Sequence, residues 1–226
     1  MLLQLNDISV EIIRKPIKHI YIRIDSNGFV KLSAPIGCTE HYIKRFVSSR
    51  QDWIRKHTRA LKSRSEAPSF MYVSGEHHLY LGNSYPISIQ SAMGKNKIIL
   101  SPPLLHFFVK ENTTKATMEK MINAWYRSEL KKILPTLIAK WEPILGVKVK
   151  EWGIKRMKTR WGTCNPHAER IWLNLSLIKK PIRCLEYVVV HEMVHLLEAS
   201  HNKRFYALMD QFLPEWQSIR RELKST

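Results

Sequence analysis

Near its C-terminal end the chain reads Val188-Val189-Val190-His191-Glu192-Met193-Val194-His195-Leu196-Leu197, and His201 follows. Residues four apart on a helix lie about 40° from each other around the axis, so His191 and His195 share one face and can offer two imidazole nitrogens to one ion. Glu192 is rotated by about 100° from His191, which suits a group that takes a proton from water on the metal. This H-E-x-x-H pattern is typical of the metal-binding helix of zinc-dependent hydrolases.

A five-residue motif can also occur by chance, so the residues around it have to show whether it is a metal site. They are apolar on nearly every side, which predicts a helix buried in a domain core. Two histidines and a glutamate inside such a helix are costly unless they have partners. We therefore expect a metal ion to bind them.

A third protein ligand is expected, because catalytic zinc usually takes three side chains and one water. His201 has the right chemistry and follows the helix closely enough for the chain to turn back towards the ion. Glu198 lies one turn beyond His195, and we expect it to be an outer partner or a surface charge. Glu215 follows Pro214, which is typical of a helix start. We therefore predict His201 as the third ligand.

Length and composition indicate an ordinary globular protein with an unusual charge. The 226 residues are 44% hydrophobic and 25% charged, which is enough to build one large or two small cores. The net charge is +18, and both halves are cationic: 15 basic and 7 acidic residues up to Leu100 leave 22 and 12 for the rest. Such a field attracts nucleic acid, nucleotides or acidic proteins without sequence specificity. No zinc finger or RNP motif accompanies it, so any nucleic-acid contact is expected to be nonspecific.

The cysteines and the N-terminus favour a cytoplasmic protein. Cys38, Cys164 and Cys184 are odd in number and far apart, which predicts reduced thiols rather than a disulfide framework. The chain starts without a basic segment or a long apolar run, so no secretory signal is predicted. Nowhere do 18 apolar residues run together, so no membrane span is expected.

The N-terminal part alternates apolar and polar residues in short runs, which predicts β structure. Strands are predicted at Ile8–Arg14, His19–Asp25 and Phe29–Ala34. Thr39 is a predicted N-cap for one helix that ends near Arg64. Further short β runs are predicted at Tyr72–Val73, His78–Leu81, Tyr85–Gln90 and Lys97–Leu100. We place a domain boundary near Asn112, which divides the chain into residues 1–112 and 113–226.

The C-terminal part predicts a different order of elements. Helical spacing indicates a long helix from Thr113 to about Trp141. Strands are predicted at Val147–Ile154 and Ile171–Leu177, and the metal helix follows them.

Four segments of this part together resemble the YgjP-like metal-dependent hydrolases, which are related to the SprT-like and WLM zinc peptidases. They are Met157–Cys164, Ile171–Lys180, Cys184–Leu197 and His201–Asp210. The resemblance implies an α+β fold: an N-terminal mixed α/β region, then a minimal zincin domain made of a long helix, a small antiparallel sheet and the H-E-x-x-H helix. It also implies one zinc ion held by His191, His195 and His201, with Glu192 as the catalytic base. The metzincin spacing H-E-x-x-H-x-x-G-x-x-H is absent.

The predicted reaction is hydrolysis by a water molecule on zinc whose proton Glu192 accepts. Further substrate contacts are predicted just before the metal helix. The run Lys148–Arg160 is strongly basic, and if the sheet lies beside the cleft, its edge could pair with an extended peptide. Lys158, Arg160 and Trp161 are the candidate substrate-binding residues, and a solvated basic face is the alternative for the two cations.

Three functions remain open at this point. A zinc metallopeptidase acting on a protein or peptide is favoured by the motif and the order of elements. A metal-dependent nucleoside triphosphate pyrophosphohydrolase, acting for example on UTP, is the first alternative, since the family has also been associated with that activity. A nucleic-acid-associated or protein-binding module with a structural metal is the second, and it predicts binding without turnover.

Overall fold

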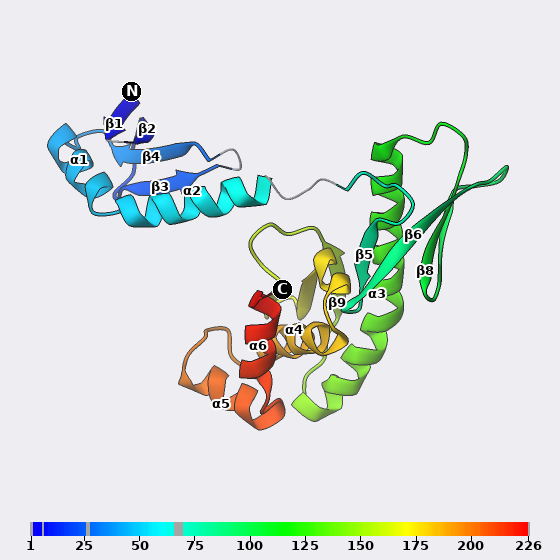
Figure 1. The fold of residues 1–226 in the computed structure, drawn as a ribbon. Coiled ribbons are helices and arrows are strands. Elements are labelled where there is room, and N and C mark those ends of the chain that lie inside the picture. Colours follow the sequence, from blue (N-terminus) through cyan, green and yellow to red (C-terminus); the bar gives the residue numbers. More distant parts are fainter. Residues whose placement is uncertain (1, 6, 26–27, 66–69, 226) are drawn as a thin grey trace. The chain divides into compact units, whose positions relative to one another are not determined.

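The computed structural model describes residues 2–5, 7–25, 28–65 and 70–225 (Figure 1). It confirms the α+β class and contains two units, Met1–Ser69 and Phe70–Thr226. Each unit has its own hydrophobic core. The division falls at Ser69 and not near Asn112, because the strands that follow Phe70 share their core with the long helix that comes after Asn112.

The first unit is a four-stranded sheet with two helices. The strands lie in the order β1 (Leu2–Leu5), β2 (Ile8–Lys15), β4 (Val30–Pro35) and β3 (Tyr21–Ile24). Alternate residues of β2 and β4 are buried, as the period of two predicts. The strand β1 was not expected from the sequence. Its four residues are too short for a clear alternation.

The helix expected after Thr39 is two helices in the structure, α1 (Glu40–Ser48) and α2 (Gln51–Ser65). Thr39 is the N-cap, and its hydroxyl accepts a hydrogen bond from the backbone N–H of Tyr42. The break comes at Ser49, whose hydroxyl donates to the Phe46 carbonyl. Serine side chains that bond to the backbone in this way compete with the regular helix.

The second unit begins with a sheet in the order β5 (His77–Tyr80), β6 (Asn83–Ser91), β8 (Leu104–Val109) and β7 (Lys97–Ser101). Three of the four expected runs are strands, and Tyr72–Val73 is not. The strand β8 was not predicted, because the two prolines directly before it, Pro102 and Pro103, are typical of a turn or loop. In the structure these prolines make the tight turn between two paired strands.

The long helix α3 (Lys115–Leu145) packs beside this sheet, and the Tyr126 hydroxyl donates to the carbonyl of Leu79 in β5. Thr114 caps its N-terminus. Gly146 ends it with a left-handed backbone at φ 66°, where glycine has no Cβ penalty. The expected long helix is confirmed, although it runs past Trp141.

The sheet beside the metal motif has the order β10 (Gly162–Asn165), β11 (Arg170–Asn174) and β9 (Glu151–Lys155). The expectation of an antiparallel sheet was wrong in one respect, because β9 and β11 run parallel. The hairpin β10–β11 returns the chain to the direction of β9, and β9 pairs with the returning strand. As a result β10 is an edge strand.

The 3₁₀ helix η1 (Leu175–Lys179) leads from β11 into α4 (Ile182–Val194), which carries the metal motif. The helix α4 is surrounded by α3, β10, β11, α5 (Lys203–Phe212) and α6 (Trp216–Ser225) (Figure 1). This position explains why α4 is apolar on almost every side. None of the helices in the described ranges has the length and hydropathy that crossing a bilayer requires.

Candidate metal centre

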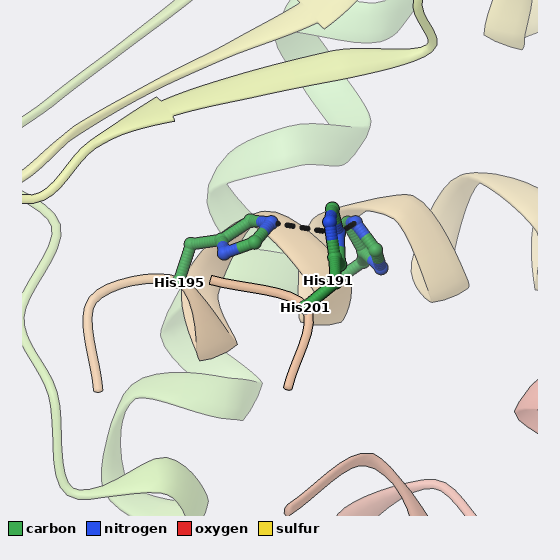
Figure 2. A group of neighbouring side chains, drawn as sticks. All are labelled: His191, His195 and His201. Atoms are coloured by element: carbon green, nitrogen blue, oxygen red, sulfur yellow. Dashed lines mark hydrogen bonds between the residues drawn. The ribbon is translucent and has the colours of Figure 1, made fainter. Parts of the chain in front are cut away.

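Three histidines from two segments converge at the end of α4 (Figure 2). His191 lies in its last turn. His195 is the residue that caps the helix, and its backbone is still helical at φ −63° and ψ −17°. The four-residue spacing therefore still places the two rings on one side. His201 approaches them from the loop before α5.

The imidazole nitrogens are spaced as one small cation requires. The Nε2 atom of His201 lies 3.0 Å from Nε2 of His191 and 3.1 Å from Nε2 of His195. A tetrahedral zinc ion with Zn–N bonds of about 2.0–2.1 Å holds its nitrogens about 3.3 Å apart. A neutral imidazole nitrogen carries either one proton or one lone pair, so His201 cannot make both contacts as good hydrogen bonds. A shared cation satisfies all three rings.

A hydrogen bond orients the His195 ring, and Phe205 packs against all three rings. The Nδ1 atom of His195 lies 3.0 Å from the Glu198 carbonyl oxygen, and a proton on Nδ1 leaves the Nε2 lone pair free for a metal. The buried ring of Phe205 lies between 4.6 and 5.0 Å from the three imidazole centroids. Phe205 therefore supports the segment of His201.

The surroundings of His191 and His201 favour the neutral form of these two rings. Burial, with smaller contributions from His195 and His201, lowers the pKa of His191 to about 3. Burial and then His195 also lower the pKa of His201. Neutral imidazole is the form that binds a metal, so these two residues favour metal binding at neutral pH.

Glu192 is only 5% exposed, and burial raises its pKa to about 8, against an opposing contribution from Arg160. The backbone of β10 lies directly against it. A Cβ added at Gly162 would lie 2.6 Å from Oε1 and 2.7 Å from Cγ of Glu192. Only glycine therefore fits opposite this carboxyl group. Gly162 is the first residue of β10, a strand that the sequence did not predict, so the close approach to Glu192 was not expected.

The family follows from the comparison of the whole chain. Residues 18–226 match the family model described as YgjP-like, metallopeptidase domain. The chain belongs to the YgjP-like family. Membership confirms the resemblance seen in the motifs, and it implies a metal-dependent hydrolase of the peptidase type. A comparison with curated proteins finds no match.

The rival carboxylates lie outside this YgjP-like centre. The group of three histidines contains no carboxylate or thiol within the described part of the chain. Glu198 instead accepts a hydrogen bond from the backbone N–H of Ser200. Glu215 is exposed, and its backbone carbonyl accepts hydrogen bonds from the N–H groups of Ser218 and Ile219 in α6. It therefore lies at a helix start, as expected.

A cleft of about 590 Å³ opens beside the centre. Of the three expected substrate residues, Arg160 and Trp161 line it, whereas Lys158 does not and is exposed to solvent. Buried Asn174 holds the loop that carries Arg160, since its side-chain amide donates to the carbonyls of Met157 and Arg160.

The cleft also contains residues that sequence reasoning missed. Arg220 and Lys224 of α6 line it, together with Tyr187 and Cys164. The two cations resemble ordinary charges on the outer face of an amphipathic helix. Only the packing of α6 on α4 shows that this face borders the YgjP-like centre.

Proposed function

We propose that this protein is a zinc metallopeptidase in which His191, His195 and His201 hold one zinc ion and Glu192 is the catalytic base. The observation that carries the proposal is the convergence of three Nε2 atoms beside a buried carboxyl group. Three neutral nitrogen ligands leave one coordination position for water or substrate, as in catalytic rather than structural zinc sites.

Bound in this site, zinc would make a water molecule more acidic and polarise the substrate carbonyl. The chain's own contribution is proton transfer by Glu192. Because burial raises its pKa, a Glu192 carboxylate oxygen takes up a proton more readily than a surface carboxylate does. The same oxygen can return the proton to the amine that leaves. The space opposite this carboxyl group, at Gly162, has no room for a side chain.

The edge strand favours a peptide as the substrate. Strand β10 pairs with β11 on one side only, and its residues Gly162, Thr163 and Cys164 line the cleft. An extended peptide can pair with such an edge through backbone hydrogen bonds. The peptide would then pass Glu192 and the histidines, which line the same cleft, and its scissile carbonyl would lie beside them.

Pyrophosphate release from a nucleoside triphosphate is the second candidate. The observation that favours it is the set of cations around the cleft, because phosphates bind well to arginine and lysine. The cations in the cleft therefore suit a nucleoside triphosphate as well as an acidic peptide. The edge strand is the feature that favours the peptide over the nucleotide.

One paired assay separates the two. Zinc-loaded protein, Glu192→Gln and the control Glu215→Gln are incubated with an unfolded protein and, separately, with nucleoside triphosphates. New peptide ends that are lost in Glu192→Gln and kept in Glu215→Gln are the expected result. Pyrophosphate that depends on Glu192, without proteolysis, would replace the peptidase with the pyrophosphohydrolase. Tight binding without turnover of either substrate would reject both.

A further inference from the structure

Three cations surround the cleft without an acidic partner. Arg160 comes from the loop before β10, and Arg220 and Lys224 come from α6. None of them forms an ion pair within the described residues. Glu192 is the one acid in the lining, and it is buried. The open part of the cleft is therefore positively charged before any metal binds.

The acids nearby are held elsewhere. Glu222 of α6 accepts two hydrogen bonds of 2.6 Å from Arg183 of α4, and Glu186 of α4 pairs with Lys140 of α3. Asp210 accepts a hydrogen bond from the Trp216 indole. These carboxylates fix the helices to one another, so the cations that line the cleft remain available to a ligand.

The packing of α6 gives the two cations their direction. Trp216, Ile219 and Leu223 are buried, and the pairing of Arg183 with Glu222 sets the rotation of the helix. Arg220 and Lys224 are four residues apart and share a face, which is the face beside the cleft.

The three cations border the reaction centre itself. Arg160, Arg220 and Lys224 line the same cleft as Glu192 and the three histidines. A ligand group bound by these cations therefore lies close to the bond that the proposed function cleaves.

We propose that the cleft selects peptides with a carboxylate close to the scissile bond, bound by Arg220 and Lys224 on one side and Arg160 on the other. The inference rests on the proposed peptidase function. A neutral or basic peptide leaves the three cations and the metal uncompensated, whereas a carboxylate forms charge-assisted hydrogen bonds with them. The carboxylate comes from an aspartate or glutamate side chain or from the C-terminus of the peptide.

A matched peptide series tests this selection. Peptides of one core sequence carry Glu, Gln or Lys on either side of the central bond, each with a free or an amidated C-terminus. With zinc-loaded wild type, kcat/KM for Glu peptides should exceed that for Gln peptides by about tenfold or more, the effect of one good charge-assisted contact. A preference that follows the free C-terminus instead identifies that carboxylate as the bound group. Equal cleavage of all peptides overturns the inference and leaves the peptidase function standing.

Variants assign the effect to residues. Arg220→Gln and Lys224→Gln should lose most of the preference and keep their zinc content, because both side chains are exposed and neither belongs to the histidine group. Arg221→Gln is the matched control, since Arg221 is exposed on the same helix and does not line the cleft. An unchanged preference in both Arg220→Gln and Lys224→Gln contradicts the assignment.

A binding measurement keeps the failure of the inference distinct from failure of the proposed function. Calorimetry with zinc-loaded Glu192→Gln compares the affinities for the Glu and Gln peptides. Zinc-loaded Glu192→Gln should bind the Glu peptide more tightly than the Gln peptide, and the double variant Glu192→Gln, Arg220→Gln should lose this difference. That result supports carboxylate selection even if wild type cleaves no peptide of the series. Binding of nucleoside triphosphates without a preference for acidic peptides overturns it.

Discussion

Two groups of histidines in the second unit differ in whether their side chains meet. His77 and His78 are adjacent in β5, yet their side chains diverge: His77 lies 2.9 Å from the Ser84 hydroxyl, and His78 is 2% exposed and stacks on Phe70. His191, His195 and His201 are far less close in sequence, yet their nitrogens meet. Neighbours in a strand point to opposite faces, whereas residues four apart on a helix share one. Spacing has chemical meaning only together with the element that carries it.

The largest expected effect tests the convergent group. His201→Ala removes one of three zinc ligands, and activity should fall by more than about 100-fold, since even groups that only orient ligands contribute 10–100-fold. Zinc retained after dialysis, measured by atomic emission, should fall in parallel. The control His77→Ala should keep both. Full zinc content in His201→Ala would show that another group is the third ligand.

Removal of the metal should destabilise the second unit. At zinc concentrations of about 1,000 times Kd, binding stabilises the folded state by about 4 kcal/mol. For a unit of this size, a chelator should therefore lower Tm by about 10 °C. Calorimetry measures the shift. The His201→Ala variant serves as the comparison, because its Tm should respond little to the chelator. Equal shifts in both proteins would place the ion elsewhere.

Gly162→Ala tests how tightly the centre is packed. The added Cβ would lie 2.6 Å from Oε1 of Glu192, so we expect displacement of the carboxyl group, a cost of about 1–3 kcal/mol in unfolding free energy, and reduced turnover. Gly94→Ala, between β6 and β7, is the matched control, since nothing lies within 4 Å of its added Cβ. Activity assays and urea unfolding measure the two effects. Wild-type turnover in Gly162→Ala would argue against Glu192 as the base.

The smallest expected effect concerns the divergent pair. Burial lowers the pKa of His78 from 6.5, with an opposing contribution from Glu76 and a supporting one from Lys179. The folded state resists protonation, so His78 contributes stability that is present above pH 6.5 and is lost as the pH falls towards its lowered pKa. In His78→Leu, unfolding free energy should therefore decline less between neutral pH and about pH 5, with unchanged zinc content. Urea unfolding at several pH values measures this, and an unchanged decline would contradict it.

The success of prediction differed between local and nonlocal features. Thr39 was recognisable as an N-cap, and the helix start predicted at Thr113 lies one residue from the observed N-cap Thr114, because a cap depends on residues within one turn. The strands β1, β8 and β10 were missed because a short strand is defined by the partner with which it pairs. The parallel pairing of β9 with β11 was not predicted for the same reason, because it joins residues about twenty positions apart, such as Glu151 and Arg170.

The sequence by itself determined the candidate metal ligands and Glu192, because helical spacing and residue chemistry are local properties that the chain carries into any fold. The tertiary structure decided what surrounds them. Arg220 and Lys224 border the cleft, Lys158 does not, and Gly162 touches Glu192, because α6, the loop before β10 and β10 itself reach α4 through packing between distant segments. Which face of a helix meets a neighbour is a property of the assembled core, and no single segment encodes it.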